Sequence, residues 1–189
     1  AGAQKAPVIH TGPFAGLKPA HYRLIAADCA TRFKSNSAAK PGRNAMRHYP
    51  VMSDEELMAL PVEDLAADPA VLFYWDTGPR IVLGKHIPIM RSWGFQPTAM
   101  GFVWIKLNPN APGLFIVKRD LHTGGGFTTR KNAEFCIIGK RGRSVREHKM
   151  VHEVIIEPRR EHSRKPEQFY DRCEQYTSGP YLDLFSRTP

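Results

Sequence analysis

Cysteine is scarce in this sequence. Its 189 residues contain three cysteines, Cys29, Cys136 and Cys173, which lie far apart and form no C-x-x-C pair. This spacing argues against a zinc ribbon and against a disulfide framework, and it fits a reducing compartment. We therefore predict no bound metal, and we expect a cytoplasmic protein.

Long hydrophobic runs are also lacking. No stretch approaches the roughly 20 apolar residues that a membrane span requires, and residues 1–7 do not have the layout of a signal peptide. No internal repeat is visible. Prolines and glycines within residues 1–20 indicate an extended N-terminal arm, and residues 21–189 are predicted to form one domain. We expect no membrane partner.

Acidic residues are few relative to basic ones. The 27 lysines and arginines exceed the 18 aspartates and glutamates and give a net charge of +9. Such an excess favours a polyanionic partner, most commonly nucleic acid, over a merely solvated basic surface. The basic residues form two groups, which we expect to flank a functional site. They are Arg32, Lys34, Lys40, Arg43 and Arg47, and then Arg130, Lys131, Lys140, Arg141, Arg143, Arg146 and Lys149.

Six short apolar runs, bounded by polar or turn-forming residues, predict buried strands. They lie at residues 22–27, 71–75, 102–105, 135–138, 154–156 and 181–185. Helical segments lie between several of these runs. This alternation favours an α/β fold with a mostly parallel sheet and helices on both faces.

Three segments carry helix signals. Ser53 and Glu56 have the spacing of a capping box at the start of a helix that Pro61 interrupts. Residues 79–93 predict a second helix, which Pro88 should kink or end early. Pro166 is predicted to occupy the first position of a third helix, which ends near Tyr176.

Polar residues directly beyond the predicted strands are the first candidates for a functional site. Asp28, Lys106 and Arg187 each follow an apolar run. Ligands of α/β sheets bind at the carboxyl ends of the strands, so we expect these three residues to lie at one edge of the sheet.

Several segments in this order resemble the adenosine-N6 methyltransferase family, which includes mRNA adenosine methyltransferases and DNA-modifying relatives from phages and bacteria. The resemblance covers nearly the whole chain from Tyr22 onward. It is carried by residues 48–57 (HYPVMSDEEL), 71–75 (VLFYW), 93–95 (WGF), 102–106 (FVWIK), 132–136 (NAEFC), 160–166 (REHSRKP) and Tyr170. It implies a Rossmann-like, S-adenosylmethionine-dependent fold with a permuted motif order.

The resemblance also implies roles for particular residues. In the family, an Asp-Pro-Pro-Trp motif follows the first strand, where the Asp and a proline carbonyl accept hydrogen bonds from the amino group of the target adenine. Asp28 occupies the position of that Asp and is expected to contact both substrate and cofactor. Lys106 and Arg187 match family positions near the cofactor, and Tyr49 matches one near the target base. The other candidates for contact with nucleic acid are Arg43, Arg47 and Arg130 from the basic groups, and Asn132 from the segment NAEFC.

Two departures from the family pattern leave two functions open. Cys29, Ala30 and Thr31 replace Pro-Pro-Trp, and the sequence ends before the segment that holds the cofactor's adenosine in the family. We expect these residues to hold only part of the cofactor pocket. A thiolate at Cys29 is disfavoured, because the carboxylate of Asp28 would raise the pKa of the thiol.

The first hypothesis is an adenine-N6 methyltransferase that acts on DNA rather than RNA, in a bacterium or a phage-infected host cell. The alternative is a catalytically degenerate family member that binds nucleic acid or stabilises a protein partner, including a second copy of itself.

Overall fold

The computed structural model describes residues 14–31, 51–111, 115–126, 128–160 and 164–186. Over these ranges the chain forms six strands and five α-helices. The strands are β1 (Tyr22–Asp28), β2 (Ala66–Asp76), β3 (Gln96–Leu107), β4 (Ala133–Arg141), β5 (Val154–Pro158) and β6 (Tyr181–Leu184). The helices are α1 (Asp54–Met58), α2 (Val62–Leu65), α3 (Gly78–Val82), α4 (His86–Ser92) and α5 (Glu167–Tyr176), with a 3-10 turn, η4 (Lys118–Asp120), between β3 and β4.

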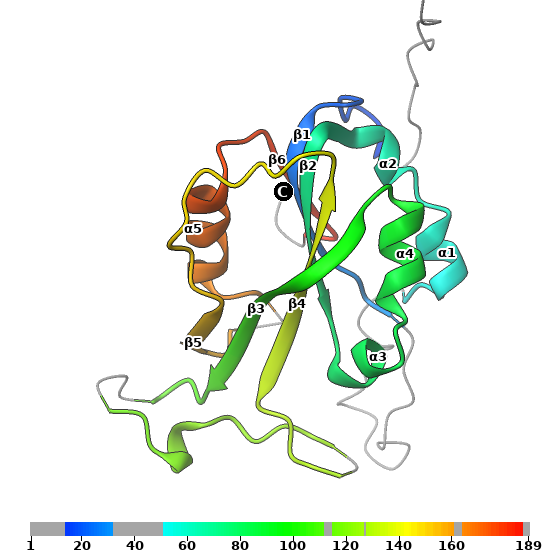
Figure 1. The fold of residues 1–189 in the computed structure, drawn as a ribbon. Coiled ribbons are helices and arrows are strands. Elements are labelled where there is room, and N and C mark those ends of the chain that lie inside the picture. Colours follow the sequence, from blue (N-terminus) through cyan, green and yellow to red (C-terminus); the bar gives the residue numbers. More distant parts are fainter. Residues whose placement is uncertain (1–13, 32–50, 112–114, 127, 161–163, 187–189) are drawn as a thin grey trace, which may run out of the picture.

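All six strands join one sheet in the order β5-β3-β4-β2-β1-β6. β4 runs antiparallel to both of its neighbours, and the other neighbouring strands pair in parallel. The parallel strands therefore end at one edge of the sheet, at the bottom of Figure 1, where the long β3–β4 connection also lies. The prediction of a mostly parallel α/β sheet is confirmed.

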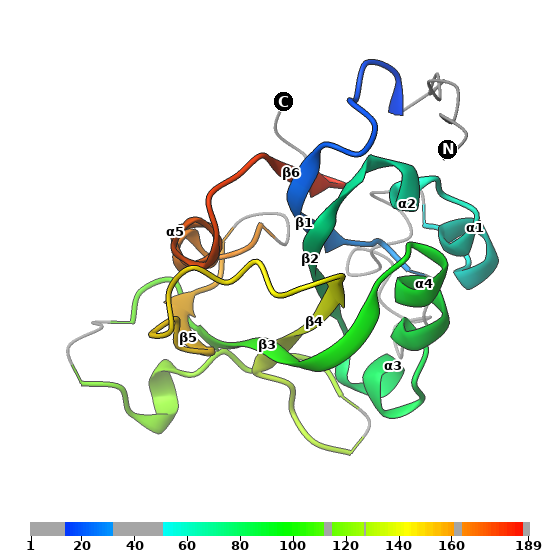
Figure 2. The same cartoon turned by 45° about the horizontal axis from the view of Figure 1, so that its top comes forward.

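Helices cover both faces of the sheet. In Figure 2, α1, α2 and α4 lie on one side and α5 lies on the other. Successive side chains of a strand point to opposite faces, so β2 contributes Leu72 and Tyr74 to one core and Phe73 and Trp75 to the other. Residues 70–76 of β2 are all buried, which explains why this strand reads as a continuous apolar run.

The predicted capping box of α1 is confirmed. Ser53 Oγ accepts a hydrogen bond from Glu56 N–H at 3.1 Å, and Glu56 Oε2 accepts one from Ser53 N–H at 2.6 Å. At α5, Pro166 is the N-cap rather than the first helical residue, so this helix begins one residue later than predicted.

The single helix predicted for residues 79–93 is wrong, because the segment forms two helices. The chain turns between α3 and α4 at Gly84, whose φ of +67° favours glycine. Pro88 neither kinks nor ends α4, since it is the third residue of that helix. Its missing N–H would have had no partner within the helix at this position.

None of the helices in the described ranges has the length and apolar character needed to cross a membrane.

Candidate active site

Asp28, the last residue of β1, lies at the carboxyl edge of the sheet. Its Oδ1 is 2.9 Å from the Nζ of Lys165, and the two side chains are 36% and 7% exposed. Lys165 is therefore a nearly buried cation that orients the Asp28 carboxylate. The carboxylate keeps access to solvent on its other side.

Lys165 also links Asp28 to two further charged residues. Its Nζ donates to Glu134 Oε2 at 2.9 Å, and Glu134 Oε1 accepts a short hydrogen bond from Lys106 Nζ. We call Asp28, Lys165, Glu134 and Lys106 the Lys165 cluster. Its members come from β1, β4, β3 and the segment before α5, so the cluster joins distant parts of the chain at one place.

Two tryptophan rings support the lysines of this cluster. Lys106 Nζ lies 4.8 Å from the ring centre of Trp104, and Lys165 Nζ lies 4.9 Å from that of Trp75. An ammonium group over an indole face is attracted by the ring's negative quadrupole. These contacts help to keep two cations in a partly buried site.

The charges of the cluster stabilise one another. Burial alone would raise the pKa of Glu134, but the adjacent Lys165 and Lys106 lower it to about 2. Burial opposes the charged form of Lys165, yet Asp28 and Glu134 raise the pKa of that ammonium group above its usual range. Both residues are consequently charged at neutral pH.

Asp183 of β6 lies beside the cluster. Tyr170 of α5 donates its hydroxyl to Asp183 Oδ2 at 3.2 Å. Reduced hydration of the Asp183 carboxylate, with a further contribution from the negative charge of Asp28, raises its pKa to about 6. The site thus contains a carboxyl group that titrates nearer to neutrality than an ordinary aspartate.

Backbone contacts fix the segment after Asp28. Met52 N–H donates to the carbonyl of Ala30 at 3.0 Å, and Thr31 pairs with Met52 in a parallel β-bridge. Thr31 is buried. Pairing with Met52 therefore restrains the segment, although the two prolines of the family motif are absent.

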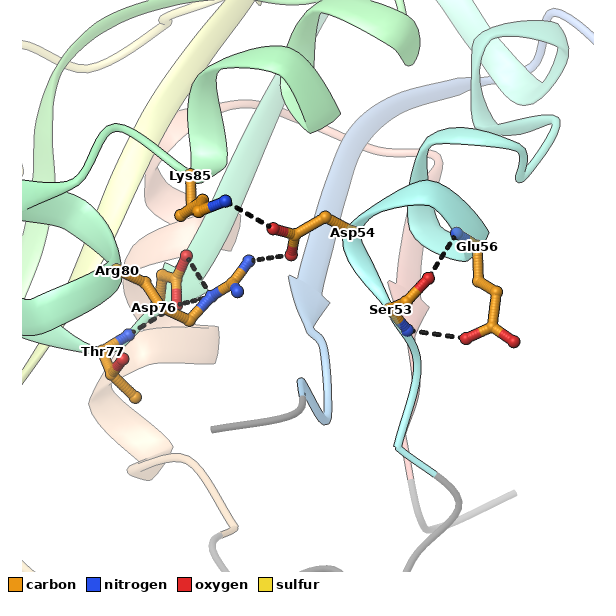
Figure 3. Close-up of polar contacts among 7 residues, drawn as sticks. All are labelled: Ser53, Asp54, Glu56, Asp76, Thr77, Arg80 and Lys85. Atoms are coloured by element: carbon orange, nitrogen blue, oxygen red, sulfur yellow. Dashed lines mark hydrogen bonds and ion pairs between the residues drawn. The ribbon is translucent and has the colours of Figure 1, made fainter. Parts of the chain in front are cut away.

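A polar network lies directly after Met52 and joins α1 to α3 (Figure 3). Asp54 accepts a hydrogen bond from Arg80 Nη2 at 2.7 Å, and its other carboxylate oxygen lies 3.5 Å from Lys85 Nζ. Arg80 also uses its Nε to donate to Asp76 Oδ1 at 2.9 Å. This network holds the start of α1 against the carboxyl end of β2.

Asp76 is the most buried carboxylate of this network, with a side chain that is 2% exposed. Its Oδ1 also accepts a hydrogen bond from Thr77 N–H at 2.7 Å. Burial raises the pKa of Asp76, and Arg80 acts in the opposite direction. Arg80 thus compensates a carboxylate that would otherwise be costly to bury.

The thiol of Cys29 is not activated. Burial raises its pKa far above the usual range, and the negative charges of Asp28 and Asp76 act in the same direction. A thiolate is the nucleophilic form of cysteine. The structure therefore agrees with the expectation that Cys29 does not attack a base.

The structure brings some of the predicted site residues together. Asp28 and Lys106 belong to the same cluster, joined through Lys165 and Glu134. Asn132 lies beside Lys106, whose N–H donates to the Asn132 carbonyl at 2.8 Å. Arg130 is exposed on the β3–β4 connection. Four predicted residues lie outside the described ranges: Arg43, Arg47, Tyr49 and Arg187.

The expectation that both basic groups flank the site is wrong for most of the second group. Lys140 and Arg141 pair with Val71 and Ala70, near the amino end of β2. Asp28, by contrast, is level with Trp75. Four residues of strand separate these levels, which corresponds to roughly 13 Å. Arg130 and Lys131 precede β4 at the site's edge of the sheet.

Sequence reasoning did not single out Lys165 or Glu134 as site residues. Both lie within segments that carry the family resemblance, residues 160–166 and 132–136. Their sequence signal was this membership, and Glu134 is also the one charged residue of its segment, NAEFC.

Comparison with known proteins identifies a family and several proteins that are similar to this chain. The MT-A70 family model matches residues 22–188. The chain is 29% identical over 142 residues to the type II methyltransferase M.MunI of a Mycoplasma species, covering 74% of this chain and 54% of that protein. It is 29% identical over 141 residues to a probable N(6)-adenosine-methyltransferase MT-A70-like of Oryza sativa, covering 74% of this chain and 18% of the relative.

The human N(6)-adenosine-methyltransferase catalytic subunit METTL3 is 27% identical over 142 residues, with 74% of this chain and 23% of that protein covered. The chain thus spans about half of the length of these relatives, or less. The family match extends over most of the chain and includes every residue of the Lys165 cluster. The chain therefore belongs to the MT-A70 family, a family of adenine-N6 methyltransferases.

Proposed function

We propose that this chain is an S-adenosylmethionine-dependent adenine-N6 methyltransferase that acts on nucleic acid, and on DNA rather than RNA. The observation that carries the proposal is the state of Asp28. Lys165 holds one of its oxygens at 2.9 Å, while the side chain remains 36% exposed. Asp28 is thus an oriented acceptor that a ligand can still reach.

An oriented acceptor is what methyl transfer to adenine requires. The lone pair of the N6 amine is delocalised into the ring, so the amine is a poor nucleophile. A hydrogen bond from N6–H to Asp28 would favour the tetrahedral form of the nitrogen and would aim its lone pair at the methyl group that the cofactor would supply. The cofactor would leave as a neutral thioether, and the proton lost from N6 would pass to solvent, to which Asp28 is 36% exposed. Preorganised groups of this kind contribute about 3–4 kcal/mol to a transition state.

A backbone carbonyl after Asp28 would supply the second acceptor. The carbonyl of Ala30 already accepts from Met52, which leaves Cys29 as the better-placed residue for this role. The pairing of Thr31 with Met52 supports a fixed geometry in this segment. These contacts would serve the purpose that proline rings serve in the family motif.

The charged groups around Asp28 fit a zwitterionic cofactor. S-adenosylmethionine carries an ammonium and a carboxylate, and when bound it supplies the methyl group as a sulfonium. Asp28 offers an acceptor for a cationic group, and Lys106 is 20% exposed and offers a donor for an anionic group. The buried Nε1 of Trp75 has no hydrogen-bond partner among the described residues, so this side of the site retains an unused donor.

The preference for DNA rests on the relatives. The chain covers 54% of a type II methyltransferase but 18% and 23% of two N(6)-adenosine methyltransferases. The net charge of +9 supports a polyanionic substrate. We also propose a reducing cytoplasm, in a bacterium or a phage-infected host, because all three cysteines are free.

A second candidate is a binding subunit without catalysis, which works with a protein partner or a second copy. The replacement of Pro-Pro-Trp by Cys29, Ala30 and Thr31 favours it. The two candidates differ in one measurable respect. A binding subunit would bind nucleic acid but would not transfer methyl groups to it, even if it also binds the cofactor.

The test is transfer of a labelled methyl group to duplex DNA, single-stranded DNA and RNA, together with calorimetric titration of the cofactor. We expect transfer to DNA, and we expect Asp28→Ala to lower its rate by about a hundred- to thousandfold. Asp171→Ala, which removes an exposed carboxylate of α5, is the matched control. Equal rates for the Asp28 variant and the unaltered chain would refute the proposed role of Asp28.

A chain that binds cofactor without transferring methyl groups would favour the second candidate. Cys29→Pro with Ala30→Pro should then restore activity if the missing prolines are the defect. Thr31 is left unchanged in this variant, because it is buried against Met52 and a tryptophan would not fit there without rearrangement.

A further inference from the structure

A cavity lies on the α5 side of the sheet, over β3 and away from Asp28. It has a volume of about 300 Å³, within the range of small-molecule sites. We call it the β3 pocket. Its walls come from residues 98–102 of β3, the end of β4, Tyr176 of α5 and residues 146–153 of the segment 142–153. In Figure 1 this segment is yellow and passes from the end of β4 along α5 to β5.

The segment 142–153 is anchored at several points. Val145 is buried in the core beneath α5, and Glu147 N–H donates to the carbonyl of Tyr176 at 2.8 Å. The Glu147 carboxylate accepts hydrogen bonds from the N–H and hydroxyl of Ser178. The carbonyl of Glu153 accepts one from Val103 N–H at 2.9 Å. These contacts position the wall of the pocket before any ligand arrives.

Three cations line the β3 pocket and have no ion-pair partner among the described residues. They are Lys140, Arg146 and Lys149. The one carboxylate in the lining is Glu153. Cations gathered in this way without a counter-charge attract an anion, and a phosphate group accepts several hydrogen bonds from them.

The other residues of the lining indicate which class of anion fits the pocket. Met100, Val151 and Tyr176 supply apolar surface, and Gly101 places bare backbone between Met100 and Phe102. Methionine adapts to flat or irregular groups. An inorganic anion has no apolar part that could pack against this surface. A fatty acid has no amine or hydroxyl that could donate a hydrogen bond to Glu153. A carboxylate beside an apolar wall can accept a hydrogen bond from the exocyclic amine of a nucleobase.

We propose that the β3 pocket binds a nucleotide, with its phosphate at Lys140, Arg146 and Lys149 and the amine of its base at Glu153. The nucleotide is either a free mononucleotide or one unit of a nucleic-acid strand. The pocket lies over β3 rather than at the tip of β1, so this binding is separate from the methyl-acceptor site. It does not depend on methyl transfer.

The experiment is a titration of the ¹⁵N-labelled full chain with adenosine monophosphate, followed by amide chemical shifts. We expect shifts at residues 98–102 and 146–153. Arg146→Glu should weaken this binding at least about tenfold, or 1.4 kcal/mol. Arg143→Glu is the matched control, because Arg143 is exposed on the same segment but does not line the pocket. It should change the affinity less than about twofold, because solvent and salt screen an exposed charge that does not line the pocket.

Two further measurements distinguish the possible sources of the ligand and test this binding separately from methyl transfer. A short single-stranded oligonucleotide that causes the same shifts indicates a strand, whereas shifts with the mononucleotide alone indicate a free nucleotide. Asp28→Ala should leave the shifts at residues 98–102 unchanged, even if that variant abolishes methyl transfer.

Three results would overturn the proposal. One is equal weakening by Arg146→Glu and Arg143→Glu, which would indicate general charge attraction. Another is inorganic phosphate that binds as tightly as the mononucleotide. The third is a set of shifts confined to the surroundings of Asp28.

Discussion

The Lys165 cluster and the β3 pocket differ in whether their charged side chains are paired. In the cluster each ammonium group faces a carboxylate, whereas the pocket has three cations without an ion-pair partner in the described part of the chain. Paired charges keep a fixed geometry and need no ligand to be stable. Unpaired cations are available to a ligand. The first arrangement suits chemistry that needs oriented groups, and the second suits capture of an anion.

The largest effect in this comparison should come from Lys165→Met. The change leaves Asp28 and Glu134 without their shared partner, and breaking a buried pair in this way costs about 3–5 kcal/mol of unfolding free energy. Urea denaturation measures the loss. Lys106→Met is the control, because Lys106 is more exposed and pairs with one carboxylate of the described residues, that of Glu134, so its loss should be smaller. Equal losses would contradict the central position of Lys165.

The pH dependence of stability should report Glu134. Its pKa is about 2 in the folded chain against an ordinary 4.5. Its contribution is therefore complete above pH 4.5 and is lost as the pH falls toward 2, because the unfolded chain takes up the proton first. The shift corresponds to roughly 3 kcal/mol.

Urea midpoints from pH 7 down to pH 3 test this expectation. Glu134→Gln should flatten the decline in stability, while Glu174→Gln, an exposed position on α5, should leave it unchanged. A decline of the same size in both variants would show that other carboxylates are responsible.

A smaller effect is expected at Arg80. Arg80→Gln leaves Asp76 buried without its cationic partner, which should cost about 2–3 kcal/mol. If the network positions the segment after Asp28, methyl transfer should also slow while cofactor affinity stays the same. Lys85→Gln is the control, since this half-exposed lysine contacts the same Asp54 at 3.5 Å and should matter little. A change in cofactor affinity alone would contradict a positioning role for Arg80.

The smallest effect should come from the capping box. Ser53→Ala removes the acceptor for Glu56 N–H and should lower the unfolding free energy by about 1 kcal/mol. Ser53→Asp keeps an acceptor at the N-cap and should recover most of the loss. Thermal unfolding of the three chains provides the measurement. A Ser53→Asp chain as unstable as Ser53→Ala would mean that the cap is not the cause.

Local sequence signals predict much of the fold. The apolar runs locate all six strands of the described residues. The signal is strongest for β1, β2 and β4, whose consecutive buried residues leave few polar side chains in the run. The capping box is readable because both partners lie within four residues of each other. Strand direction is different, because an apolar run has the same appearance in both directions.

Because an apolar run does not reveal the direction of its strand, Glu134 was not predicted at the site. β4 is antiparallel, so its first residues lie at the edge where the parallel strands end. Glu134 consequently enters the site from the beginning of a strand, whereas the rule for parallel sheets places ligands at the carboxyl ends of strands. Lys165 enters from the segment before a helix. Asp28 and Lys106 lie at the carboxyl ends of β1 and β3, which is where this rule places a site.

The pairing of β1 with β6 has a consequence for the order of folding. The two strands are neighbours in the sheet, with Leu24 opposite Tyr181, although most of the chain lies between them. Such distant pairings form slowly, because a long loop must close before the contacts stabilise it. As the chain emerges from a ribosome, Asp28 appears well before Lys165 and β6. The nascent chain therefore carries an unpaired Asp28 and an uncovered edge of β1 until residues 165–184 have been synthesised, and both are completed at nearly the same moment.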